Sequence, residues 1–194
     1  LDEALVAVHA GSDALHDRIM AVPGAFERVE RAVANLSAEG VETGIVFVLN
    51  RLNLHEAVPC LEHFRTLGAT RFVFSFLRST GRLRADAALR RGLNLTWGKA
   101  LPFIQDAAQA GRGLGAKVEV LHVPPCVLGE DWRLAGDMTA ENAAVPGDAR
   151  ESSLAHCARP KLRRCLECRY LLRCPGPCED YLEFHGSKGV RPIA

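Results

Sequence analysis

The amino-acid sequence predicts an α/β protein, in the form of a partial (β/α) barrel followed by a small, irregular, cysteine-rich module. Two observations lead to this fold class. Over residues 1–123, short apolar runs alternate with stretches in which apolar residues recur every three or four positions, which is typical of buried strands alternating with amphipathic helices. Beyond these residues the periodicity ends, and four of the seven cysteines fall within residues 165–178. We therefore expect a barrel segment over residues 1–123, an irregular connector over residues 124–155 and a cysteine module over residues 156–194.

The first part contains four predicted strands, each a run of mostly apolar residues, at residues 4–9, 44–49, 71–77 and 117–123. Apolar positions at helical spacing predict three helices between them, near residues 26–36, 57–64 and 97–108. Gly40, Gly68 and Gly111 end these helices, and Asn53 is the expected N-cap of the second. Crossovers of this length join parallel strands and are right-handed, which gives an open sheet or a barrel. Because four strands do not close a barrel, we expect a partial barrel or the second half of a longer one.

Composition and charge exclude several classes of protein. The formal net charge is +1, whereas a nucleic-acid binder needs a basic surface to neutralise phosphates. No run of about 20 apolar residues is present, so we expect no membrane span. The first residues lack the pattern of a secretion signal. Without such a signal, clustered cysteines indicate metal binding rather than disulfides, and we expect a reducing, cytoplasmic location.

The motif Cys165-x2-Cys168-x5-Cys174-x3-Cys178 is the strongest chemical signal in the sequence. Thiolates are soft ligands that select zinc or iron–sulfur clusters, and the Pro-Gly-Pro sequence before Cys178 bends the backbone around the site. A closed four-cysteine zinc site is one interpretation. Unequal spacing crowded into one loop favours an iron–sulfur cluster. Further candidate ligands and basic neighbours that would stabilise an anionic cluster are Cys126, Cys157, Arg159, Lys161, Arg163, Arg164, Arg169 and Arg173.

Polar residues at the ends of the predicted strands are candidates for binding a cofactor. His9 could line a pocket or be an ordinary loop histidine, and Asn50 could contact a cofactor or belong to a turn. Arg78 could bind a carboxylate or be solvated. We expect His16 and Asp17 to cap the turn before the first helix rather than to carry out acid–base chemistry.

Several of these segments together resemble the radical S-adenosylmethionine (SAM) superfamily. The segment from Ala7 to Ala10, the His16-Asp17 pair and the segment from Pro23 to Phe26 are similar to its fourth-strand region. Further similar segments follow in the family's order, at residues 35–41, 48–53 and 67–77. Cys126 after Pro125, the cysteine motif, Tyr181 and Gly186 resemble the SPASM- or twitch-like C-terminal extension of many members, whose cysteines hold an auxiliary [4Fe–4S] cluster.

The sequence departs from the family in three ways. The Cys-x3-Cys-x2-Cys motif that holds the SAM-binding cluster is absent, so we expect it upstream of Leu1, together with about three strands. Ala7 replaces a serine that is common in the fourth strand. In some members a basic residue lies four positions after the family histidine, and in this sequence that position is Met20.

The resemblance implies the C-terminal portion of a radical SAM oxidoreductase or maturase. The full-length enzyme would bind SAM and a second [4Fe–4S] cluster, generate a 5′-deoxyadenosyl radical and take electrons from a flavodoxin or ferredoxin. This chain would contribute His9, Asn50 and Arg78 to the cavity and would be inactive alone. By analogy, a peptide substrate fits the C-terminal module, whereas no nucleic-acid or membrane partner is expected. The alternative is a zinc-stapled α/β binding module without catalytic activity.

Overall fold

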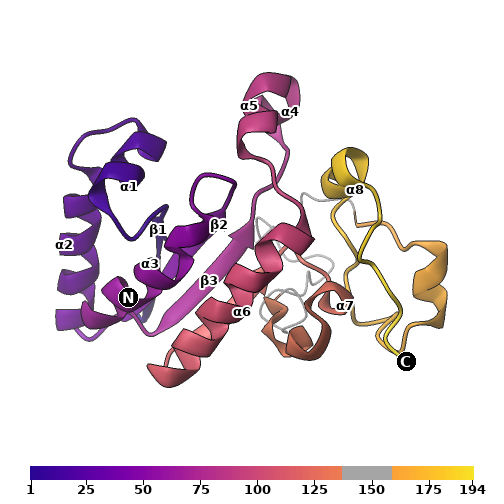
Figure 1. The fold of residues 1–194 in the computed structure, drawn as a ribbon. Helices are drawn as coiled ribbons and strands as arrows, with labels where there is room; N and C mark the ends of the chain where they lie inside the picture. Colours follow the sequence, from indigo (N-terminus) through magenta and orange to yellow (C-terminus); the bar gives the residue numbers. More distant parts are fainter. Residues whose placement is uncertain (137–158) are drawn as a thin grey trace.

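The computed structural model describes residues 1–136 and 159–194, and its centre is a four-stranded parallel sheet (Figure 1). The strands are β1 (Glu3–Val8), β2 (Glu42–Leu49), β3 (Arg71–Phe76) and β4 (Lys117–Leu121). Their spatial order is the same as their order in the chain. The α/β class and the four predicted strands are therefore confirmed, with ends that differ by one or two residues.

The three predicted helices are also confirmed: α2 (Ala25–Ala38), α3 (Ala57–Thr66) and α6 (Trp97–Gly113). Three further helices lie in stretches where we predicted no helix: α1 (Asp13–Met20), α4 (Gly81–Ala85) and α5 (Ala87–Leu93). They bury few side chains, so their apolar periodicity is weak in the sequence. A short 3₁₀ helix, η1 (Leu54–Glu56), precedes α3. No helix among the described residues is long and apolar enough to cross a membrane.

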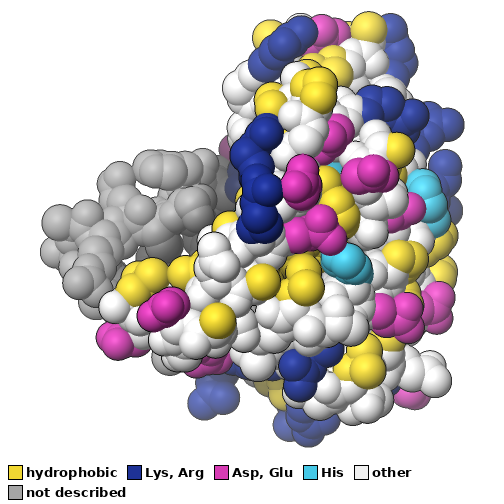
Figure 2. Space-filling model, turned by 90° about the vertical axis from the view of Figure 1, so that its left-hand side faces the viewer, with side chains coloured by type: hydrophobic (Ala, Val, Ile, Leu, Met, Phe, Trp, Pro, Cys, Tyr) yellow, Lys and Arg dark blue, Asp and Glu magenta, His cyan; other side chains and the backbone are white. Residues whose placement is uncertain are grey.

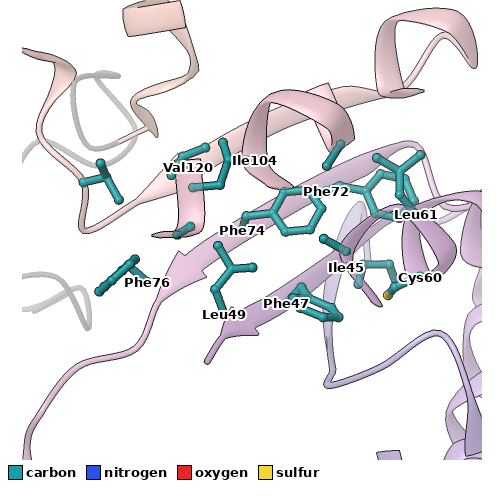
Figure 3. Close-up of a cluster of buried hydrophobic side chains, with 14 of the residues drawn as sticks. Ile45, Phe47, Leu49, Cys60, Leu61, Phe72, Phe74, Phe76, Ile104 and Val120 are labelled. Carbon is teal, nitrogen blue, oxygen red and sulfur yellow. The ribbon is translucent and has the colours of Figure 1, made fainter. Parts of the chain in front are cut away.

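Helices α2, α3 and α6 cover the same face of the sheet. The cross-strand register aligns Val8 with Phe47 and Phe47 with Phe74, so alternate residues of every strand point to this face. Phe26 and Val33 of α2, together with residues of α3 and α6, belong to the same hydrophobic core as these strand residues. Figure 3 shows part of this core, with helix residues against strand residues: Cys60, Leu61 and Ile104 facing Ile45, Phe47, Leu49, Phe72, Phe74, Phe76 and Val120.

The opposite face of the sheet is more polar. Arg71 of β3 bonds to Glu3 of β1 and to Glu119 of β4, at 2.5 and 2.8 Å. Leu5 of β1, on this same face, is 51% exposed. The two faces therefore differ in composition.

On the side of the molecule where α1 and α2 lie, basic and acidic side chains are both present among apolar ones (Figure 2).

Residues 124–136 are more ordered than the irregular connector that we predicted. They form α7 (Pro125–Leu128) and the 3₁₀ helix η2 (Gly129–Leu134), and Ala135 makes a parallel bridge to Val120 of β4. The prediction missed them because helices this short have no readable periodicity. Residues 137–158, which include the predicted ligand Cys157, lie outside the described part of the chain.

The C-terminal module contains the 3₁₀ helix η5 (Arg163–Glu167) and helix α8 (Glu179–His185). It lies beside the end of the sheet that carries α7 (Figure 1). The Tyr181 ring of α8 stacks on Trp97 at the start of α6, with ring centroids 3.5 Å apart, and the Tyr181 hydroxyl accepts the Trp97 backbone N–H at 3.0 Å. The module is thus joined to the sheet domain by buried contacts.

Candidate metal centre

Four cysteines from separate turns line one cavity. Cys126 comes from α7, Cys165 from η5, and Cys168 and Cys174 from the turns that follow. The remaining walls are mainly apolar or proline residues, with Lys161 and Arg191 as the charged ones. The fold therefore brings Cys126 to the three cysteines that open the C-terminal motif.

The local backbone explains how these thiols reach one point. Pro125 begins α7 at the carboxyl edge of the sheet, just after β4, and Cys126 follows it. In the module, the backbone N–H of Cys165 bonds to the Leu162 carbonyl at 2.8 Å, and that of Cys168 bonds to the Cys165 carbonyl at 3.1 Å. These tight turns hold Cys165 and Cys168 on the same side of the chain.

Backbone N–H groups surround the sulfur atoms. The Gly176 N–H donates to Cys174 Sγ and the Ile193 N–H donates to Cys168 Sγ, both at 3.4 Å. The Arg191 backbone N–H lies near the Cys126 thiol and lowers its pKa. Hydrogen bonds of this kind orient thiolate ligands and tune a bound metal centre. Gly176 has φ +99°, a conformation that favours glycine, and this turn aims its N–H at the sulfur.

The thiols also affect one another electrostatically. Burial raises the pKa of Cys126 most, the Arg191 N–H lowers it, and the neighbouring Cys174, Cys165 and Cys168 raise it further. Burial likewise raises the pKa of Cys174, against the effects of the Gly176 N–H and of Lys161. Thiols bind metals as thiolates, so loading this site with metal would release protons.

Four thiols that line one cavity could hold either a closed zinc site or an iron–sulfur cluster. A tetrahedral zinc site with Zn–S bonds of about 2.3 Å requires sulfurs about 3.8 Å apart. Among the described residues, no group of three or more Cys, His, Asp or Glu side chains is arranged to hold one metal ion. The four thiols line one cavity, with N–H hydrogen bonds to the sulfurs of Cys174 and Cys168. A [4Fe–4S] cluster binds each thiolate through a different iron, which permits wider spacing.

Cys178, the fourth cysteine of the sequence motif, does not line this cavity. It is 1% exposed, precedes the first residue of α8 and belongs to the main hydrophobic core. Cys60 is also in the core, on α3, where burial raises the pKa of its thiol. Of the six predicted ligands, the structure brings together Cys126, Cys165, Cys168 and Cys174.

His9 and Asn50 lie at neighbouring strand ends and both take part in internal hydrogen bonds. The Asn53 side chain donates to the His9 and Val48 carbonyls, at 2.9 and 3.0 Å, and accepts the Asn50 N–H at 2.8 Å. Asn53 was predicted to cap a helix, but its side chain bonds to these strand ends instead. The Asn50 side chain accepts the Leu52 N–H at 2.9 Å, which is the turn role considered for it.

Arg78, which we considered as a cofactor-binding or solvated residue, pairs with a carboxylate of the protein itself. Its Nε donates to the two carboxylate oxygens of Asp180 on α8 at 2.9 and 3.1 Å, and the Ser79 N–H donates to the same group at 2.6 Å. The Arg78–Asp180 ion pair thus connects the module to the end of β3. The position of Arg78 in the sequence did not reveal this partner. Asp17 caps α2 as expected, accepting the Gly24 and Phe26 N–H groups.

Sequence reasoning missed the contribution of residues 190–193 to the cavity. Arg191 and Ile193 act there through backbone N–H groups, which every residue except proline carries, so no residue type could have signalled them. The segment is held in place by Arg164, which donates to the Val190 carbonyl at 3.0 Å, and by the Arg169 N–H, which donates to the Ile193 carbonyl at 2.9 Å.

A scan against models of known protein families found no match to this chain, and a search of curated proteins found none either.

Proposed function

We propose that Cys126, Cys165, Cys168 and Cys174 hold an auxiliary [4Fe–4S] cluster, and that the chain is the C-terminal portion of a radical SAM enzyme. The observation that carries the first part is the convergence of four thiols on one cavity, with N–H hydrogen bonds to two of the sulfurs and the Arg191 N–H near a third. When bound, such a cluster supplies one-electron transfer. The surrounding apolar and proline residues limit the access of water to the sulfurs.

The sheet topology supports the second part. A doubly wound sheet reverses its strand order and has helices on both faces. Here the order is β1-β2-β3-β4 without reversal, and α2, α3 and α6 cover one face. Successive right-handed crossovers of this kind generate a (β/α) barrel, so we interpret the sheet as a partial barrel.

The site's position in the proposed barrel has a functional consequence. Barrel enzymes carry their active sites at the carboxyl ends of the strands. Cys126 follows β4 at that end, so a cluster bound there would lie next to the substrate cavity. In the complete enzyme, SAM and the catalytic cluster would occupy the same end. The residues of this chain would hold the auxiliary cluster and form part of the cavity wall.

Anaerobic reconstitution with iron and sulfide tests the cluster. We expect a brown protein with broad visible absorption and about four iron atoms per chain. C126A should lose most of this absorption, because Cys126 supplies one of the four thiolates. The matched control is C178A, which removes a buried thiol outside the cavity and should keep the iron content.

Three results would overturn the proposal: a colourless chain with stoichiometric zinc, iron content that is unchanged in C126A, or iron that is lost only in C178A. The first of these would support the alternative zinc-stapled module.

A further inference from the structure

The positive charge of the chain is concentrated in the module that carries the cysteine cavity. Residues 159–194 contain eight Lys or Arg and four Asp or Glu, a formal charge of +4, whereas the whole chain has +1. The remaining residues, 1–158, therefore carry −3. Within residues 159–178, six basic residues accompany a single acidic residue, Glu167. An even distribution of charge would not place this excess beside the thiols.

The basic side chains lie around the cavity in particular. Lys161 and Arg191 line it. Arg164, Arg169 and Arg173 adjoin cavity-lining cysteines in the chain, Arg163 lies two residues before Cys165, and all six of these basic residues are exposed. We call this set the basic rim: Lys161, Arg163, Arg164, Arg169, Arg173 and Arg191.

Two large apolar side chains are exposed within the same segments. Leu166, between Cys165 and Cys168, is 65% exposed, and Leu172, close to Cys174, is 97% exposed. Exposed leucines beside exposed charges match the composition of protein interfaces, in which an apolar centre is surrounded by a polar edge. Small interfaces dominated by complementary charge are typical of short-lived redox complexes.

We propose that the basic rim is the docking surface for an acidic one-electron carrier protein. The inference rests on the proposed cluster, because a carrier seated on the rim would lie against the turns whose thiolates hold it. One electron would pass from the reduced carrier to the oxidised cluster, which changes from the 2+ to the 1+ state while the carrier is oxidised by one electron. No bond is broken and no proton is transferred.

The two kinds of group have separate tasks in this complex. Charges attract the carrier over about a Debye length and raise the rate of association by 10- to 1,000-fold. Leu166 and Leu172 would exclude water from the centre of the contact. An acidic peptide would satisfy the charges equally well, but it would not use the closeness of the rim to the thiolates.

The test measures how fast a reduced, acidic flavodoxin reduces the reconstituted chain in stopped flow, at low and high ionic strength. The variant is R163E/R173E, because both side chains are exposed and neither residue lines the cavity. The matched control is R31E/R112E, the same charge change on exposed residues of α2 and α6. Dithionite, a small reductant, reports whether the cluster itself is intact.

We expect R163E/R173E to slow reduction by flavodoxin at low salt by about tenfold or more, with the difference disappearing at high salt. The control should react like the unmodified chain, and excess dithionite should reduce all three proteins to the same final extent.

Equal rates with flavodoxin in all three proteins would overturn the docking surface while leaving the cluster in place. Absence of a dithionite-reducible cluster in the unmodified chain would instead remove the proposed function.

Discussion

Replacing Asp180 with asparagine should weaken the attachment of the cysteine module to the sheet domain and lower the free energy of unfolding. The Asp180 side chain is 5% exposed and accepts hydrogen bonds from Arg78 and from the Ser79 N–H, while the Arg78 side chain is 18% exposed. Removing one partner of a buried ion pair costs about 3–5 kcal/mol, because the other charge stays buried without compensation. Since Arg78 keeps some access to water, we expect a loss of about 3 kcal/mol, or a fall in Tm of about 6–12 °C.

Urea unfolding of the chain, with all variants in the same metal state, measures this effect. The control is E183Q on the same helix, which removes an exposed ion pair with Arg84 and should cost at most about 1 kcal/mol. A double-mutant cycle with R78M should show coupling above about 1 kcal/mol. If D180N costs no more than E183Q, or if D180N and R78M are additive, the module is not held by this pair.

Three further predictions follow from the contacts at the cavity and at the sheet edge. I193P removes the N–H that bonds to the Cys168 sulfur and should lower the cluster's one-electron potential by about 40 mV, from about 1 kcal/mol of differential hydrogen bonding, whereas I193V should not change a redox titration. G176A places a Cβ 3.1 Å from two carbonyl oxygens at φ +99° and should destabilise the module by about 1–3 kcal/mol in urea, whereas G98A, with open space around it, should be neutral or stabilising. Burial lowers the pKa of His16, whose Nδ1 accepts the His9 N–H, so the unfolded chain binds this proton more readily and stability should fall as the pH drops below about 6.5. In H16N the amide oxygen keeps the acceptor but does not titrate, so urea unfolding at pH 7.5 and 5.5 should differ less than in the unmodified chain; an equal difference would refute the assignment.

Local patterns in the sequence predicted the framework of the fold. Buried strands are continuous apolar runs and the helices that cover them are amphipathic, so β1 to β4 and α2, α3 and α6 follow from periods that need no tertiary information. Helices α1, α4 and α5 were missed for the same reason, because short helices with few buried residues leave little periodicity.

The cysteine motif was also readable, but its ligand set was not. Spacing along the chain treats Cys174 and Cys178 as equivalent neighbours, whereas the Pro-Gly-Pro turn and the start of α8 direct Cys178 into the core. Spacing gives no reason to join Cys126 to the motif, but the fold places it at the cavity because α7 follows the end of β4.

The sequence by itself determined the order of strands and helices and the presence of a clustered cysteine motif, since both depend on residues close together in the chain. Only the tertiary structure decided which thiols meet, that Arg78 pairs with Asp180, and that backbone N–H groups of residues 191 and 193 face the sulfurs. These contacts join residues far apart in the chain, and their partners are selected by the packing of α7 and α8 against the sheet, which no local pattern encodes.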